Sequence, residues 1–227
     1  MKISNYLKLS KEANTINDIY MLPSEFKCKY KNLEGLERDA LISHIILNNI
    51  PYVFRSKPIL YEMIVKYLSD ILEVNSNFIY LIGSGKTGFS ISPGADYGKI
   101  FSESSDLDFT IVDKILFDKL AKEYELWSKA YLVDGKCYPK NEREKSYWDE
   151  NILRLKKNII NGFLDTYKIP NIEICLEVKK INNVIYLISQ KLNEYHQIKV
   201  KGISVRVYQD EESFINQLSL NTRKCLE

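Results

Sequence analysis

Hydrophobic residues recur along this chain with two different periods. In the segment 58–73 they return every three or four residues, which is the spacing of one helix face. The same spacing predicts helices over 36–49, 115–130, 144–160 and 210–225, and a short helix near 6–20 is expected before a loop through Pro23. Runs of aromatic and β-branched residues, continuous or alternating, predict strands over 78–82, 106–112 and 199–208.

The segment 172–196 carries both periods. Residues 172–178 alternate between apolar and polar, as in a strand, but seven apolar residues between Ile174 and Tyr195 keep steps of three and four. Because seven positions fit the helical pattern and four fit the strand, we expect a helix. The preceding stretch, between Gly162 and Pro170, is expected to be an irregular connection.

Together these elements predict an α/β (α+β) fold, with a small mixed β-sheet flanked by N- and C-terminal helices. We expect three parts. Residues 1–75 form an N-terminal helical segment packing on the core, and residues 76–135 form the core itself. Residues 136–227 add further helices, a late core strand and a closing helix.

Composition narrows the functional classes. Of 227 residues, 45% are hydrophobic and 27% are charged, as in a packed globular protein. The net charge of +2 is too small to indicate a nucleic-acid partner by itself. The four cysteines are widely separated and form no zinc or redox motif, which suits a reducing cytoplasm. No segment has the length and apolar character of a signal peptide or a membrane span, so we expect a cytoplasmic protein with no membrane partner.

The candidate chemistry lies in residues 78–113. A buried strand ends at Gly83-Ser84, a Gly-rich polar segment follows, and Asp106-Leu107-Asp108 opens the next strand. Residues two apart on a strand share a face, so the two carboxylates should lie side by side and repel each other unless a cation joins them. Mg²⁺ (or Mn²⁺) prefers carboxylate oxygens together with substrate phosphates. A glycine turn lets the backbone approach a phosphate closely, so this combination is typical of phosphoryl or nucleotidyl transfer.

At these residues the chain resembles the DNA polymerase β-type nucleotidyltransferase superfamily, and a branch of small bacterial members in particular. The shared pattern is a strand, Gly83-Ser84, and then Asp-x-Asp opening the next strand, although Asp106 follows Ser84 by 22 positions, more than is usual in that family. The resemblance implies transfer of a nucleoside monophosphate from an NTP to an acceptor hydroxyl on RNA, protein or a small molecule. It also implies a place in a toxin–antitoxin or phage-defence system, with a cognate partner protein.

The residue pattern and the resemblance together suggest roles for individual residues. Asp106 and Asp108 are the expected catalytic and metal-binding carboxylates. The expected nucleotide-binding residues are Gly83, Ser84, Lys86, Ser90 and Arg206. Arg206 is expected to face a phosphate or to pair with one of the two aspartates, and Lys86 is equally consistent with an exposed loop lysine.

A third carboxylate is less clearly defined. Two-metal transfer sites commonly use three acids, and the late strand over 199–208 offers none at its inward positions. Glu173 or Glu177 would supply the acid if their segment were a strand, and Asp210 follows the late strand directly. The remaining alternative is that no third acid exists and the site is a one-metal or degenerate version.

Rival interpretations of the glycines are weaker. Gly83-x-Gly85-x-x-Gly88 matches a dinucleotide-binding fingerprint, but the serines, prolines and glycines that follow disfavour the helix this motif needs. A P-loop would need glycine at position 80, which is Tyr80, and no His-Arg-Asp follows as in a kinase. A plain hairpin with solvated acids stays open as a structural alternative. We also expect the segment 85–105 to cover a nucleotide, with its apolar residues anchoring it to the body.

A second functional class also remains. On the same fold, the chain could be a catalytically weak nucleotide sensor or a partner-binding module, which the unassigned third acid favours and the intact Asp-x-Asp opposes.

Overall fold

The computed structural model describes residues 7–226, which form eight α-helices, short 3-10 and π turns and one four-stranded sheet. The helices are α2 (Pro23–Asn32), α3 (Gly35–Ile42), α4 (Pro58–Leu72), α5 (Ser84–Thr87), α6 (Lys114–Leu132), α7 (Glu142–Ile160), α8 (Leu176–His196) and α9 (Glu211–Leu226). The strands are β1 (Ile79–Ile82), β2 (Asp106–Val112), β3 (Phe163–Asp165) and β4 (Gly202–Tyr208). The expected α+β class is confirmed.

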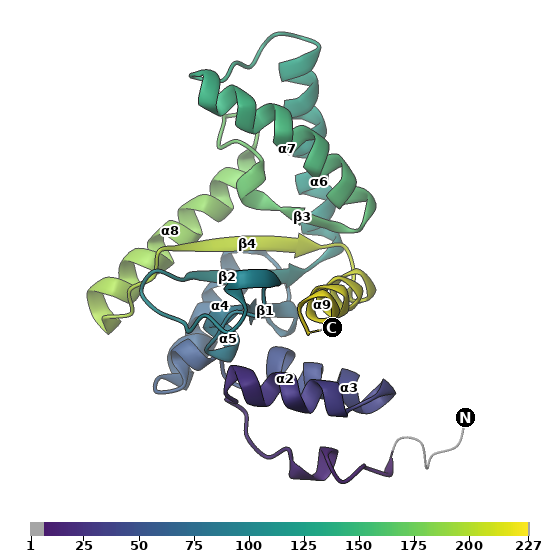
Figure 1. Ribbon diagram of the computed structural model, residues 1–227. Helices are drawn as coiled ribbons and strands as arrows, with labels where there is room; N and C mark the ends of the chain where they lie inside the picture. The colour runs from purple at the N-terminus through teal and green to yellow at the C-terminus, as the bar shows by residue number, and fades with distance from the viewer. Residues whose placement is uncertain (1–6, 227) are drawn as a thin grey trace.

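The sheet lies at the centre of the molecule, with strand order β1-β2-β4-β3 (Figure 1). β1 and β2 are antiparallel, β2 and β4 are parallel, and β3 is antiparallel to β4. The parallel pair needs a long crossover, which is supplied by α6, α7, β3 and α8. This crossover brings residues almost a hundred positions apart into register, with Asp108 opposite Ser204.

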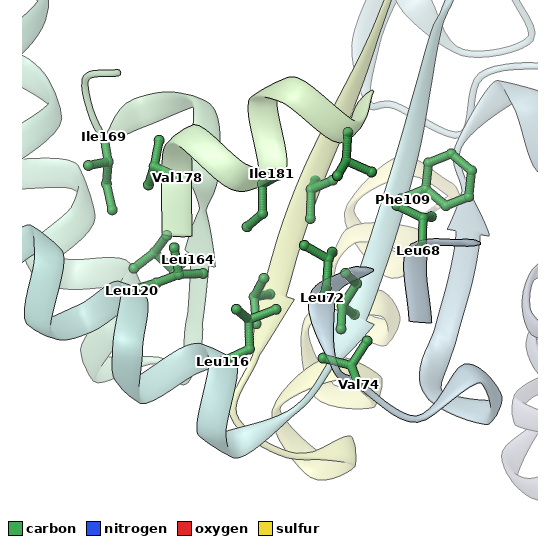
Figure 2. Close-up of a cluster of buried hydrophobic side chains, with 14 of the residues drawn as sticks. Leu68, Leu72, Val74, Phe109, Leu116, Leu120, Leu164, Ile169, Val178 and Ile181 are labelled. Carbon is green, nitrogen blue, oxygen red and sulfur yellow. The ribbon is translucent and has the colours of Figure 1, made fainter. Parts of the chain in front are cut away.

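One face of the sheet carries the main hydrophobic core. Leu107, Phe109 and Ile111 of β2 alternate inward and pack with α4, α6 and α8 (Figure 2). Leu68 of α4 and Leu120 of α6 are fully buried in this cluster. Burying each such side chain stabilises the fold by about 1.5–3 kcal/mol, so the apolar faces of the helices hold them on this side.

The other face of the sheet is more polar and has a different cover. Where β2 and β4 end, Phe214 of α9 packs on Tyr80 and Tyr208, with ring centroids 5.2 and 5.1 Å away. The N-terminal helices α2 and α3, together with a π-helical turn over Ser43–Leu47, form a second small core beside it. Figure 1 shows α2 and α3 at the end of the molecule opposite α7.

The structure confirms most of the expected elements and corrects four. A helix within the Gly-rich segment was disfavoured, but Ser84–Thr87 form the single-turn helix α5. The helix expected near 6–20 is only a 3-10 turn over Ala13–Thr15 in the described part of that range. The expected loop at Pro23 is the start of α2, because proline fits the first turn of a helix. The segment 162–170 was expected to be irregular but contains β3 and a 3-10 turn.

The ambiguous segment resolves in favour of the helix. α8 begins at Leu176, so the strand alternative for residues 172–178 is wrong, and its buried residues follow the expected helical steps. Within residues 7–226, no helix combines the length and apolar composition needed to cross a membrane.

Candidate active site

Asp106 and Asp108 lie side by side on the polar face of the sheet, as their spacing predicts. They open β2, and Leu107 between them points into the core, where it is fully buried. Asp108 is opposite Ile82, the last residue of β1, so the turn after β1 lies next to its side chain. The alternating burial of β2 therefore accounts for the orientation of both carboxylates.

Gly83 forms the floor beneath Asp108. Its backbone has φ of +69° and ψ of −157°, a conformation that side-chain-bearing residues rarely adopt. A Cβ atom at this position would lie 3.0 Å from Asp108 Oδ2. Glycine is thus required twice, once for the turn and once because the carboxylate packs directly against its backbone. Ser84 follows and starts the four-residue helix α5.

Ser204 on β4 completes the surroundings of Asp108. Its hydroxyl donates a hydrogen bond of 2.7 Å to Asp108 Oδ1. Burial raises the pKa of Asp108, and the charges of Asp106 and Asp165 raise it further, while the Ser204 hydrogen bond and Arg206 act against the shift. The carboxyl group therefore lies in a place where its negative charge is poorly compensated by the protein.

A third acid, Asp165, lies on the same face but was missed in the sequence. It ends β3 opposite Arg206 of β4, and the whole residue is only 1% exposed. Its Oδ1 accepts a hydrogen bond of 2.6 Å from Arg206 Nε, and its Oδ2 accepts one of 2.6 Å from Lys168 Nζ. β3 has three residues, too few to show a period, so nothing in the local sequence marks it as a strand.

Arg206 consequently has a different partner from the ones expected. Its salt bridge is with Asp165, not with Asp106 or Asp108. Burial disfavours its charge, yet the Asp165 carboxylate and, after it, Tyr208 more than offset this and raise the pKa of the guanidinium above its usual value. Arg206 stays charged and fixed in place, next to the other predicted site residues.

These groups line one cavity of about 500 Å³. Its floor is the polar face of β2, β4 and β3, and Leu218, Asn221 and Thr222 of α9 contribute to its wall. The predicted site residues that line it are Gly83, Ser84, Ser90, Asp106, Asp108 and Arg206. The structure thus brings together six of the seven residues that sequence analysis selected.

The segment after α5 folds back on itself as a hairpin-like loop at the cavity. Phe89 and Ile100 form an isolated bridge, and Ser90 N–H donates to the Lys99 carbonyl at 2.8 Å. Ser90, Ser92, Asp96 and Lys99 of this loop line the cavity. The segment is therefore an ordered wall of the cavity.

Apolar side chains anchor this loop, as predicted, with one exception. Phe89 is buried against Phe26, and the Tyr97 hydroxyl donates to the Pro23 carbonyl at 2.6 Å. Phe101 packs on the main core. Ile100 does not anchor the loop, because it is 56% exposed.

Lys86 is the seventh predicted residue, and it lies apart from the cavity lining. It is only 3% exposed, and its ammonium donates to the backbone carbonyls of Asn49 and Leu47. Burial lowers its pKa to about 8. Because α5 turns its side chain toward the N-terminal segment, Lys86 ties two parts of the fold together instead of facing the carboxylates. It is also not the exposed loop lysine of the alternative interpretation.

None of the expected third acids reaches the cavity. Glu177 begins the first turn of α8 and pairs with Lys119 at 3.3 Å. Glu173 is exposed just before that helix. Asp210 accepts the N–H of Ser213 and so caps the start of α9. None of the three lines the cavity: Glu173 and Glu177 belong to the approach and the first turn of α8 and not to a central strand, and Asp210 caps α9.

The donor set suits a hard divalent cation. Asp106 and Asp108 supply carboxylate oxygens on one face of the sheet. The Lys201 ammonium lies 3.7 Å from Asp106, but it is exposed, so this ion pair stabilises the fold by at most about 1 kcal/mol and does not replace a cation. In the described chain, no three His, Cys, Asp or Glu side chains are grouped so that they could hold a metal ion together. The protein alone therefore offers two ligands, and a polyphosphate would have to supply others.

The chain was compared with protein-family models, curated proteins and solved structures, and none of them matched.

Proposed function

We propose that this protein is a Mg²⁺-dependent nucleotidyltransferase, which moves a nucleoside monophosphate from an NTP to an acceptor hydroxyl. One observation carries the proposal: Asp106 and Asp108 stand together on β2, with Asp108 packed on the Gly83 turn that ends the neighbouring strand. Paired carboxylates beside a turn that a phosphate can approach closely are what such a transfer needs. The resemblance of the residues 78–113 to the nucleotidyltransferase superfamily points the same way.

In this proposal each group has a defined task. Asp106 and Asp108 bind Mg²⁺ or Mn²⁺, which supplies positive charge to the triphosphate when it is bound. Gly83 and Ser84 hold the phosphates, and Ser90 contacts the nucleotide from the loop. The raised pKa of Asp108 fits this role, because a cation would relieve the repulsion that burial and the nearby acids impose on its charge.

A second function has its own supporting observation. Asp165, the additional acid at the cavity, has both oxygens engaged by Arg206 and Lys168. A site with only two available carboxylates is also compatible with a nucleotide sensor or partner-binding module that turns over slowly. Cognate protein partners and a role in defence belong to the same set of proposals.

Calorimetry with each of the four NTPs, with and without Mg²⁺, tests nucleotide binding. We expect at least one NTP to bind in a metal-dependent manner. Asp108→Asn should abolish this binding, since it removes the charge while keeping an oxygen for the Ser204 hydrogen bond. Asp70→Asn is the matched control, because Asp70 is an exposed acid on α4 that pairs with Lys66 on the same helix.

Incubation with α-labelled NTPs, Mg²⁺ or Mn²⁺, and total RNA or protein separates the two functions. A labelled product that Asp108→Asn fails to make supports the transferase. Metal-dependent binding without any labelled product supports the sensor. No metal-dependent binding of any NTP contradicts both.

A further inference from the structure

Arg206 is held in the cavity by a set of buried contacts. Its Nε–H donates to Asp165, its guanidinium lies 5.0 Å from the centre of the Phe163 ring, and its side chain remains 29% exposed. The fork of an arginine carries five N–H donors. With its position fixed on one side by Asp165, Arg206 is preorganised to bind an anion on the cavity side.

Asp165 acts on Arg206 and is not available as a further metal ligand. Its side chain is 2% exposed, and its two oxygens accept hydrogen bonds from Arg206 and Lys168, with Asn158 adding a contact of 3.3 Å. A metal ion could be bound there only by displacing one of these two cations. Removing one partner of a buried ion pair leaves an uncompensated charge, so the arrangement opposes that exchange.

Thr110 supplies an independent sign of a ligand. It is fully buried and lies in the cavity lining, and its hydroxyl oxygen has no hydrogen-bond partner among the residues that the structure describes. Thr110 is opposite Arg206 in the register of β2 and β4, so both side chains are on the same face. A buried hydroxyl without a partner is unfavourable, and a bound anion that accepts its hydrogen would remove this penalty.

The strand next to the two aspartates contributes a neutral residue at the position nearest to them. Ser204 is opposite Asp108 and reaches its carboxylate with a hydroxyl. A carboxylate at this position would add a third negative charge beside Asp106 and Asp108. Without such a carboxylate, the two charges of Asp106 and Asp108 balance a single divalent ion. The next side chain of β4 on this face is the cationic Arg206.

We propose that this site takes one divalent cation, on Asp106 and Asp108, and that Arg206 with Thr110 supplies the second positively polarised group by binding an anionic oxygen of the nucleotide. Asp165 is then a positioning residue for Arg206. This inference rests on the proposed function, because it assumes that a nucleotide and a cation share the cavity.

Mn²⁺ titration followed by electron paramagnetic resonance counts the ions directly, without requiring turnover. In the presence of saturating non-hydrolysable NTP analogue, we expect one tightly bound Mn²⁺ per chain. Two ions per chain would overturn this inference and leave the proposed function intact. No bound Mn²⁺ and no bound analogue would overturn both.

Substitution of Ser204 tests why the count is one. Ser204→Asp places a third carboxylate beside Asp108 and should raise the count to two, whereas Ser204→Asn, of similar shape but neutral, should leave it at one. A count of one in both variants would contradict the inference, because the missing carboxylate would not be what limits the site.

Two further variants test the anion-binding group. Arg206→Gln and Thr110→Val should each weaken binding of the analogue, by about tenfold or more for the arginine, with the count of Mn²⁺ unchanged. Thr110→Val keeps the shape of a fully buried side chain, so it folds even if Arg206→Gln leaves Asp165 poorly paired. Arg154→Gln on the exposed face of α7 is the control. Wild-type affinity in both Arg206→Gln and Thr110→Val would refute the role assigned to them.

Discussion

Lys86 provides the most quantitative prediction, because its buried position and its assignment to the nucleotide site cannot both hold. Burial lowers its pKa from an ordinary value of 10.5 to about 8. In the unfolded chain the ammonium regains its ordinary pKa, so the unfolded state binds more protons between these two values. Stability must therefore rise with pH across this window.

The size of the effect follows from the same shift. At neutral pH the amine is charged in both states, and its burial costs about 3 kcal/mol, from 1.36 kcal/mol per pKa unit. Between pH 7 and pH 9 the buried amine loses its proton, and the free energy of unfolding rises by about 1.3 kcal/mol. Lys86→Met removes the titration altogether, although it leaves the carbonyls of Asn49 and Leu47 without their donor, at about 1–3 kcal/mol each.

Because these two effects oppose each other, the stabilities of wild type and Lys86→Met must be compared over a range of pH. Urea unfolding of wild type and Lys86→Met, followed by the fluorescence of the buried Trp127 and Trp148, measures the free energy of unfolding at each pH. We expect wild type to gain about 1.3 kcal/mol relative to the variant between pH 7 and pH 9. A difference that is constant with pH would refute the buried position of Lys86.

Nucleotide binding supplies a second measurement on the same variant. Because the Lys86 side chain is outside the cavity lining, Lys86→Met should bind NTP analogues with wild-type affinity. A large loss of affinity in a folded Lys86→Met protein would mean that the lysine reaches the phosphates after all.

Three other predictions follow from the same structure. Gly83→Ala should destabilise the fold by about 1–3 kcal/mol through backbone strain and also abolish Mn²⁺ binding by pushing Asp108 away, as seen in calorimetry. Gly94→Ala, with φ of +79° and no atom within 4 Å of its Cβ, should show strain alone. Burial and the nearby acids raise the pKa of Asp108, so its charge destabilises the folded state at neutral pH. Asp108→Asn should therefore raise the melting temperature at neutral pH. This gain should vanish as the pH falls below the ordinary carboxyl range, where Asp108 is protonated in both states. In a thiol-reagent assay the exposed Cys28 should react in the folded protein. Burial raises the pKa of the Cys175 thiol to about 12, so Cys175 should react only on unfolding.

Local patterns in the sequence were sufficient for the two aspartates and their turn. Asp106 and Asp108 share a face because the side-chain period of a strand is two, and Gly83 marks the backbone conformation that the turn needs. The helices also follow from the spacing of apolar residues, which is a property of neighbouring positions. Such features depend on a few residues of contiguous chain, so they can be predicted without knowing what packs against them.

The third acid and the partner of Arg206 depended on the tertiary structure alone. Asp165 belongs to a three-residue strand that exists because β4 provides a hydrogen-bonding edge, and that edge lies about forty positions further along the chain. The crossover through α8 then sets the register that brings Arg206 to Asp165 and Ser204 to Asp108. The orientation of Lys86 also could not be predicted from the sequence, because it depends on two backbone carbonyls of the N-terminal segment. Long-range pairing determines which charges meet, and no local pattern encodes it.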